Sequence, residues 1–465
     1  MSGTKTVLVI VGEDIILRNI FETDFKEELM RECKGVEARF VYVTPPELYE
    51  RCRQVLGADA NILTLDHIRP ARLFSLVMFL SRNALRTHTN EWERKRAYAD
   101  GRSSFVGMLA KSTFSLCAGN SSFIKRLLRS LFIMLPSDSK VSKLFSSVKP
   151  DIVVSLCLVR FDFDVPIARE AKKRRIFLIG MVRSWDNLTS HGLLNVPPDV
   201  FFFQNAFLAD AAKRYQAIMP GEQDQVVGVP HYDHYFEPQR TVLSRQELFD
   251  YVGLDNSKKL ILYGAMGEFL FVRESDMIDV FRDALHSHEL SNAQVLFRAH
   301  PSFTPPAAYV PDPRIRVFIP SGFTGSDKGI SSSRLLMSMI YHADLVVTCG
   351  STFGIDSVVL NKPLICIGFD GHHQETYWRS AARFYDSYTH YEAFMEAGNI
   401  ALARSEKELE GLMIEYLKSD TTNSVCRDDV IKLLVAPFDG KSGRRLAQNM
   451  AAVIQKKLRQ VVKDS

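Results

Sequence analysis

Short apolar runs alternate with helix-like stretches along most of the chain. The first run, residues 7–11 (VLVIV), precedes a polar loop at residues 12–14 and a helical pattern at residues 18–33. Short apolar runs separated by helices are typical of buried parallel strands joined by crossover helices. The same alternation predicts further strands at residues 38–43, 152–156, 176–180, 200–203, 259–263, 294–298, 314–319, 345–348 and 363–367.

Two interruptions of this alternation predict the domain organisation. Residues 66–145 mix apolar runs with basic side chains, with ten Lys/Arg against three Asp/Glu between residues 81 and 130. A polar stretch after residues 228–233 predicts a crossing between domains. We therefore expect an α/β protein of two Rossmann-like domains with parallel sheets facing across a cleft: residues 1–235 with a helical insert at about 66–145, residues 236–440, and a basic helix at 441–465 that crosses back to the first domain.

Composition narrows the class of protein. A chain of 465 residues with 46% hydrophobic and 24% charged residues is long enough for two folded cores. The net charge of +4 gives no reason to expect a nucleic-acid partner. Seven dispersed cysteines favour a reducing compartment and no structural zinc. No run reaches the roughly 18 apolar residues of a membrane span, and residues 7–11 are too short for a signal peptide, so we expect a cytoplasmic protein.

Three strands of the second half each lead into a polar loop, at residues 264–268, 298–302 and 349–354. Because the carboxyl ends of parallel strands lie at one edge of a sheet, we expect these loops to meet and to bind a nucleotide donor. Glycines allow close backbone approach, and a helix N-terminus offers amides to a phosphate. The candidate donor-binding residues are Gly264, Gly267, Glu268, Arg298, His300, Pro301, Gly350, Ser351, Thr352 and Phe353.

Four of these candidates have a defined chemical role. Arg298 and His300 would neutralise a leaving phosphate, and His300 also counts as a catalytic candidate. The hydroxyls of Ser351 and Thr352, with the adjacent amides, would bind a diphosphate without a metal ion. The alternative is that Ser351 or Thr352 serves as the N-cap of the helix expected from residue 355.

In the first half, the strand at residues 176–180 leads into a loop that suits an acceptor. Asp186 is the leading candidate for the base that removes a proton from an acceptor hydroxyl, and Glu13 and Asp14 after the first strand compete for that role. Each of these residues also has a structural interpretation. The Trp185 ring would lie in the core and Asp186 would cap a turn, while Glu13 and Asp14 would cap a helix or complement its dipole. The candidate acceptor-binding residues are Arg183, Trp185 and Asn187.

Two patterns resemble metal ligands but favour a structural role. Asp162 and Asp164 have the DxD spacing of metal-dependent transferases, yet Pro166 follows, which predicts Asp164 as a helix N-cap. His372 and His373 are adjacent and do not converge on one ion in a strand or helix. We therefore expect no metal and no other cofactor.

Residues 123–135 of the insert combine an apolar helical surface with Lys125, Arg126 and Arg129. This pattern fits a helix that lies on an anionic membrane surface. It fits equally well a buried helix whose long cationic side chains reach out to water. The sequence therefore leaves both interpretations open.

The motifs of the second half occur in an order that resembles a known fold family. His300-Pro301, residues 343–348 (ADLVVT), Gly350-Ser351-Thr352 and residues 361–367 (NKPLICI) resemble the donor-binding domain of GT-B-fold glycosyltransferases. The similarity is greatest to bacterial surface-polysaccharide transferases and to CDP-glycerol glycerophosphotransferases. In the first half, the segments SWDNLTS (184–190) and GVPHYD (228–233) resemble the strand-end and linker segments of such enzymes. The resemblance implies a nucleotide-activated donor in the second domain and an acceptor in the first.

The function that we expect from these observations is transfer of a sugar from a nucleotide-sugar donor to a bacterial surface glycan. The glycan would be O-antigen or capsule, carried on a lipid at the cytoplasmic face of the inner membrane, with peripheral membrane contact by the enzyme. A CDP-glycerol transferase is one alternative, and a CMP-sugar transferase for Kdo or sialic acid is another, although Gly12-Glu13-Asp14 reverses the acid-acid-glycine order of that group. A non-hydrolysing sugar-nucleotide 2-epimerase and a non-catalytic glycan-binding subunit complete the alternatives.

Overall fold

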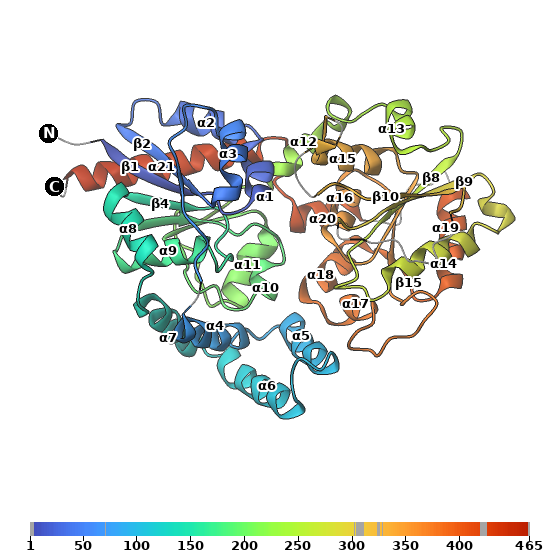
Figure 1. Cartoon of the computed structure of the whole chain (residues 1–465), viewed down its shortest axis with the longest axis horizontal. Helices are drawn as coiled ribbons and strands as arrows, with labels where there is room; N and C mark the ends of the chain where they lie inside the picture. Colours follow the sequence, from blue (N-terminus) through green and yellow to red (C-terminus); the bar gives the residue numbers. More distant parts are fainter. Residues whose placement is uncertain are drawn as a thin grey trace. The chain divides into compact units, whose positions relative to one another are not determined.

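The computed structural model describes residues 4–69, 71–301, 303, 311–322, 326–327, 329–418 and 426–463. The chain forms two compact units (Figure 1). The first comprises Met1–Arg94, Ser103–Asp233 and Lys432–Ser465, and the second Lys95–Arg102 and His234–Ile431. Each unit contains one parallel sheet with helices around it, which confirms the predicted α/β class with two Rossmann-like domains.

The sheet of the first unit has the strand order β3-β2-β1-β4-β5-β6-β7, and every paired strand is parallel. From β1 the chain moves outward to β2 and β3 and then returns to β4 on the other side of β1. The order of strands therefore reverses between β1 and β4, where the crevice of an open α/β sheet lies. The strands are β1 (Lys5–Ile10), β2 (Ala38–Thr44), β3 (Ile62–Thr64), β4 (Ile152–Ser155), β5 (Phe177–Gly180), β6 (Val200–Phe203) and β7 (Gln225–Val226).

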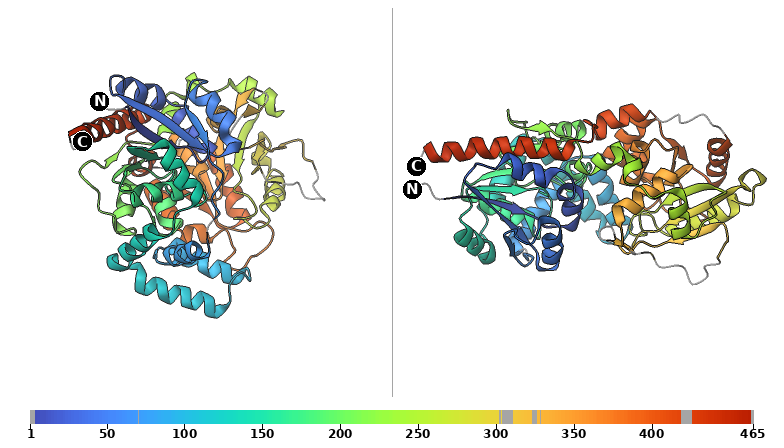
Figure 2. Two further views of the ribbon diagram at one scale, coloured as in Figure 1. Left: turned by 60° about the vertical axis from the view of Figure 1, so that its left-hand side comes forward. Right: turned by 90° about the horizontal axis from the view of Figure 1, so that it is seen from above.

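Helices cover this sheet, and the last helix of the chain is among them. The helix expected at residues 18–33 is divided, because a π-helical turn at Leu17–Phe21 precedes α2. The C-terminal helix α21 packs beside α2 (Figure 2). The Asp233 carboxylate accepts the amides of Ser442 (2.8 Å) and Gly443 (2.7 Å), which fixes the start of α21. The helices are α1 (Asp14–Ile16), α2 (Phe25–Glu32), α3 (Tyr49–Leu56), α8 (Ser139–Val148), α9 (Asp164–Lys173), α10 (Asn187–Ser190), α11 (Ala206–Arg214) and α21 (Ser442–Lys463).

The insert folds into four helices between β3 and α8: α4 (Arg72–Asn83), α5 (His88–Ala99), α6 (Phe105–Gly119) and α7 (Ser122–Met134). Lys125 and Arg129 of α7 do not lie on the exposed face of the helix. The Lys125 ammonium donates to the Tyr215 carbonyl, and Arg129 Nη2 donates to the Gln216 carbonyl (2.6 Å), so both cations are buried. No helix in the described part of the chain is long and apolar enough to span a bilayer.

The second unit has the strand order β10-β9-β8-β13-β14-β15, again entirely parallel. Here the order reverses between β8 and β13. The strands are β8 (Lys259–Gly264), β9 (Ala293–Arg298), β10 (Ile315–Phe318), β13 (Leu345–Thr348), β14 (Leu364–Ile367) and β15 (Ala401–Ala403), with a separate antiparallel pair, β11 (Ser326–Asp327) and β12 (Ile330–Ser331). The helices, with α12 and α20 at the junctions between units, are α12 (Asp233–Phe236), α13 (Arg245–Val252), α14 (Met277–Ala284), α15 (Ser332–His342), α16 (Thr352–Val359), α17 (Arg383–Ser387), α18 (Thr389–Gly398), α19 (Glu406–Lys418) and α20 (Arg427–Leu434).

Candidate functional site

The three polar loops of the second unit start at neighbouring positions of the sheet. Gly264 at the end of β8 pairs with Arg298 at the end of β9 on one side and with Thr348 at the end of β13 on the other. The Thr348 hydroxyl donates to the Gly264 carbonyl (2.7 Å) and ties β8 to β13. The strand register therefore confirms that the loops meet at one sheet edge, beside the point where the strand order reverses.

The loop after β13 forms a capped helix N-terminus. Gly350 has a φ of 38°, and its amide donates to the Tyr385 hydroxyl (2.9 Å). Ser351 Oγ accepts the amide of Phe353 (3.1 Å), so Ser351 is the N-cap of α16. The helix thus begins at Thr352, three residues before the expected start at residue 355. Thr352 is exposed at this helix end, whereas the amides of Phe353 and Gly354 donate to the side chain and the carbonyl of Ser351.

The loop after β8 depends on two glycines. A Cβ on Gly264 would lie 2.4 Å from a ring carbon of Phe353, so this buried ring packs directly on the backbone of β8. Gly267 has a φ of 101°, and a Cβ there would lie 3.0 Å from the His300 ring. Phe353 is therefore a packing residue instead of the ligand contact that we expected. Glu268 is exposed and accepts a hydrogen bond from Ser275 (2.9 Å).

The loop after β9 supplies a cation and an imidazole. Arg298 is buried at the strand end, whereas His300 and Pro301 are partly exposed. The His300 ring lies edge-on to Phe269, with 5.3 Å between ring centroids. Burial, and after it the charge of Arg298, lowers the pKa of His300. A neutral imidazole can then serve as a hydrogen-bonding group while Arg298 supplies the positive charge.

Glu274 supports this edge and was not foreseen from the sequence. Its buried carboxylate accepts hydrogen bonds from the Tyr263 hydroxyl (2.8 Å) and from the amides of Met266 (2.8 Å) and Gly267 (2.6 Å). Burial raises the pKa of Glu274 to about 7, although the backbone bonds oppose the shift. Glu274 lies in a short turn with no periodic pattern, so nothing in the sequence distinguishes it from a surface acid.

A hollow of about 560 Å³ lies on the same unit, at residues 368–380 and 404–407 after β14 and β15. His373 lies on its wall and is hydrogen-bonded to Asp276 (3.2 Å), while His372 is hydrogen-bonded to Glu406 (2.8 Å). The adjacent histidines thus bind different acids and do not share a ligand.

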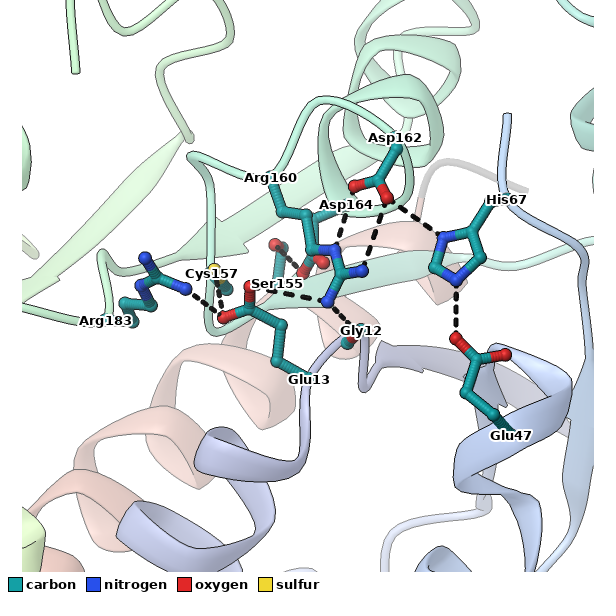
Figure 3. Close-up of polar contacts among 10 residues, drawn as sticks. All are labelled: Gly12, Glu13, Glu47, His67, Ser155, Cys157, Arg160, Asp162, Asp164 and Arg183. Atoms are coloured by element: carbon teal, nitrogen blue, oxygen red, sulfur yellow. Dashed lines mark hydrogen bonds and ion pairs between the residues drawn. The ribbon is translucent and has the colours of Figure 1, made fainter. Parts of the chain in front are cut away.

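A second group of strand-end polar residues lies in the first unit (Figure 3). Glu13 follows β1, Arg160 follows β4, and Arg183 follows β5. The Glu13 carboxylate accepts Arg183 Nη1 at 2.5 Å and lies 3.3 Å from Arg160 Nη1, which also donates to the Gly12 carbonyl (2.8 Å). Glu13 is therefore held between two guanidinium groups at the β1/β4 crevice.

The same group extends away from Glu13 through a chain of polar contacts. Arg160 donates twice to Asp162 (2.8 and 3.2 Å), and Asp162 lies 3.1 Å from His67, which in turn contacts Glu47 (2.5 Å). These partners come from widely separated parts of the sequence. Asp162 was noted from the sequence only for its DxD spacing, and the position of Arg160 in the loop after the buried strand β4 is the sequence signal that could have identified it.

Asp164 differs from its expected role as a helix N-cap. Phe163 occupies the N-cap position, and Asp164 is the first residue of α9, with its carboxyl group buried in the core. Its Oδ1 accepts the Ser155 hydroxyl (3.1 Å). Burial, and after it the charge of Glu13, raises the pKa of Asp164 well above its usual value. The two acids of the DxD pattern therefore point to different partners, and the described residues contain no group of three His, Cys, Asp or Glu suited to a metal.

The free energy of unfolding of Asp164→Asn, relative to that of the parent protein, is expected to increase as the pH rises. The unfolded chain releases the Asp164 proton near pH 4, whereas the folded protein retains it, so parent stability falls as the pH rises above that value. Asparagine carries no titrating proton. Urea unfolding of both proteins at about pH 5 and pH 8 measures the change in their difference.

Asp439→Asn is the matched control. Burial alone would raise the pKa of Asp439, but the bond from Arg445 outweighs it and lowers the pKa. The stability contributed by Asp439 is lost only below pH 4, so its variant should differ from the parent equally at both pH values. If the difference in unfolding free energy between Asp164→Asn and the parent is also the same at both pH values, Asp164 is not protonated in the folded protein.

The predicted acceptor loop is more tightly packed than expected. Trp185 is only 6% exposed, and its ring centroid lies 6.4 Å from that of Phe207. The indole is thus in the core and does not offer a face to a sugar. Asn187 is also buried, and its Oδ1 accepts the Ser184 amide (3.1 Å). Arg183 alone among these three candidates reaches the group around Glu13.

The competing acids have separate partners. Asp186 stands at the start of α10, where Oδ2 accepts the Ser190 hydroxyl (2.8 Å) and Oδ1 accepts the Asn187 amide group (3.2 Å). Asp14 pairs with Arg51 (3.1 Å). Asp186 therefore stabilises a turn, while Glu13 lies at the crevice of the sheet.

Solved structures share the fold of both units. A putative UDP-N-acetylglucosamine 2-epimerase from Listeria monocytogenes is 12% identical, with a TM-score of 0.52 over 98% of both chains. The S. aureus MnaA–UDP co-structure is 11% identical, with a TM-score of 0.54 over 97% of both chains. UDP-GlcNAc 2-epimerase from Neisseria meningitidis bound to UDP-GlcNAc is 10% identical, with a TM-score of 0.51 over 96% of this chain and 100% of that chain. At these identities the likeness concerns the fold alone.

Sequence comparison identifies the family. None of the curated proteins matches this chain. The family model described as CDP-Glycerol:Poly(glycerophosphate) glycerophosphotransferase matches residues 206–452, which include β8, β9, β13 and the loops that follow them. The resemblance to GT-B transferases and to CDP-glycerol glycerophosphotransferases is thus confirmed. Because the match covers more than half of the chain, the protein belongs to the CDP-glycerol:poly(glycerophosphate) glycerophosphotransferase family.

Proposed function

We propose that the protein transfers a glycerophosphate or glycosyl group from a nucleotide-activated donor to a bacterial surface glycan. The observation that carries this proposal is the meeting of three polar strand-end loops beside the β8/β13 crevice. The family description favours CDP-glycerol as donor. A nucleotide sugar is the second candidate, because two structures of the same fold contain UDP or UDP-GlcNAc.

The donor diphosphate in this proposal lies at the edge formed by Gly264, Arg298 and the N-terminus of α16. Arg298 and the amide of Thr352 would stabilise the negative charge of the departing group, and His300 would hydrogen-bond to it. In glycerophosphate transfer, the acceptor oxygen bonds to the β-phosphorus as the bond to CMP breaks. In sugar transfer, the acceptor oxygen bonds to the anomeric carbon as the nucleoside diphosphate leaves.

The acceptor in this proposal is a hydroxyl of a lipid-linked glycan at the cytoplasmic face of the inner membrane. Glu13 is the best candidate for the group that takes the hydroxyl proton, because it is the strand-end acid at the crevice of the first unit. Asp186 is the second candidate. The charge compensation comes from protein groups, so the proposed reaction requires no metal ion.

A thermal-shift comparison of CDP, CMP, UDP, GDP and dTDP tests the donor site. A ligand that binds only the folded protein raises its melting temperature. We expect CDP or CMP to give the largest shift for a glycerophosphate donor, and UDP, GDP or dTDP for a sugar donor, with no change on addition of EDTA. No shift with any nucleotide would contradict the proposed function, and a shift lost with EDTA would contradict metal independence.

His300→Ala and Ser351→Ala are each expected to weaken nucleotide binding about tenfold. His300→Ala removes a hydrogen bond to the charged phosphate, and Ser351→Ala removes the N-cap that holds the start of α16 in place. Isothermal titration with the best nucleotide measures the dissociation constants. His286→Ala, an exposed histidine of the same unit that follows α14, is the matched control and should bind as the parent does. Unchanged binding in both site variants would remove the donor site from this edge.

A further inference from the structure

Helix α7 departs from the usual arrangement of a surface helix, because its buried face carries Lys125 and Arg129 beside the apolar Leu128 and Phe132. A helix on the surface of a water-soluble protein usually buries its apolar stripe and exposes its polar side chains. In α7, Lys125 and Arg129 are buried against backbone carbonyls, as described above. The opposite face is exposed and carries large apolar side chains at intervals of three and four residues: Phe123 (74% exposed), Leu127, Leu131 and Met134 (74% exposed).

Two neighbouring helices of the first unit continue this exposed apolar face. Helices α4, α6 and α7 pack against one another (Figure 1), and Lys111 of α6 lies over the Phe79 ring of α4, 5.7 Å from its centroid. Eleven of the eighteen exposed large hydrophobic residues found in the described ranges lie on these three helices, so the exposure is concentrated. Those on α4 are Leu73, Leu76 and Phe79, and those on α6 are Phe105, Val106, Leu109 and Leu116.

The charge of this face distinguishes between possible occupants. The sequence has no Asp or Glu between residues 67 and 90 or between residues 101 and 137, so α4, α6 and α7 contain no acid. Arg72, Arg82 and Arg126 are exposed on these helices. A second copy of the chain would bring like charges together, whereas anionic lipid headgroups would pair with them. The combination of apolar and cationic groups is that of an interfacial membrane-binding surface.

We propose that the exposed apolar face of α4, α6 and α7 docks on the surface of a bilayer that contains anionic lipid. Phenylalanine, leucine and methionine side chains enter the boundary between headgroups and acyl chains, and the arginines contact lipid phosphates. Its use in reaching a lipid-linked acceptor rests on the proposed function, whereas lipid binding can be measured without any donor or acceptor.

Cosedimentation of the full chain with vesicles tests this surface. One set of vesicles contains only phosphatidylcholine, and the other contains roughly 30% phosphatidylglycerol. We expect binding to the anionic vesicles that weakens with salt, and about tenfold weaker binding or more for Phe123→Glu and Met134→Glu. Met30→Glu is the matched control, because Met30 lies on α2 and is 48% exposed, and it should bind as the parent does.

Each outcome has a defined meaning. Absence of binding to anionic vesicles, or binding that is unchanged in Met134→Glu, overturns the proposal. A dimer that forms without vesicles and is lost in Met134→Glu, with no vesicle binding, assigns the face to a second copy and also overturns it. The variants should keep the nucleotide-induced melting shift of the parent. Vesicle binding without any nucleotide shift would contradict the proposed function and leave the membrane surface standing.

Discussion

Gly12→Ala is expected to destabilise the first unit by about 3 kcal/mol. A Cβ on Gly12 would lie 2.0 Å from Asp164 Oδ2 and 3.1 Å from a ring carbon of Phe163. Both side chains are fully buried, so neither has free space into which it can move. Moving the Asp164 carboxyl also breaks its hydrogen bond with Ser155. Urea unfolding followed by tryptophan fluorescence measures the loss.

Two further variants identify the cause of this loss. Gly411→Ala in α19 meets no atom within 4 Å and is the matched control, expected to be neutral or stabilising by up to about 1 kcal/mol. Asp164→Ala removes the group that the new methyl would strike. The double variant Gly12→Ala/Asp164→Ala should therefore be more stable than the sum of the two single losses implies. Strictly additive losses would show that the contact between these two positions is not the cause.

The apolar pattern predicts the central strands well because they are buried on both faces, whereas the partly exposed strands β3, β7 and β15 were not predicted. Residues 200–203 and 345–348 are strands at the expected bounds, and the other nominated runs differ by one or two residues. Helices cover both faces of a parallel sheet, so nearly every side chain of a central strand is apolar. Such a strand therefore appears in the sequence as a continuous apolar run. We predicted the start of α16 at residue 355, where its apolar residues begin. The helix starts earlier, at Thr352, because Ser351 is its N-cap.

The candidate site was predictable where the order of parallel strands brings its loops together, and not where it depends on contacts between individual side chains. The loops after β8, β9 and β13 could be placed together because parallel strands end at a common edge. The ion pairs of Arg160 with Glu13 and Asp162, in contrast, depend on side-chain directions that no periodicity encodes. Burial was also misjudged, since Trp185 in a polar loop faces the core. In α7 the buried face includes Arg129 beside Leu128 and Phe132, because the backbone carbonyls of Leu194 and Gln216 accept hydrogen bonds from its guanidinium group.

Glu13→Gln is expected to lower turnover at least about a hundredfold, which is the usual effect of removing a general base. The substitution keeps the size of the side chain and its position between Arg160 and Arg183 but removes its negative charge. Nucleotide binding is expected to remain within about twofold of the parent, because the donor edge belongs to the second unit. Release of the nucleotide product, measured with a surface-glycan acceptor, gives the rate.

Asp14→Asn is the matched control for this prediction. Asp14 adjoins Glu13 in sequence, but its carboxylate pairs with Arg51 at 3.1 Å, so its loss should change turnover by less than about threefold. Asp186→Asn separates the two candidate bases, because Asp186 bonds to Ser190 and its loss should mainly loosen α10. A Glu13→Gln enzyme of normal rate beside an inactive Asp186→Asn enzyme with an intact melting temperature would assign the proton transfer to Asp186. Since Glu13 alone is held by cations from the ends of β4 and β5, we expect the opposite result.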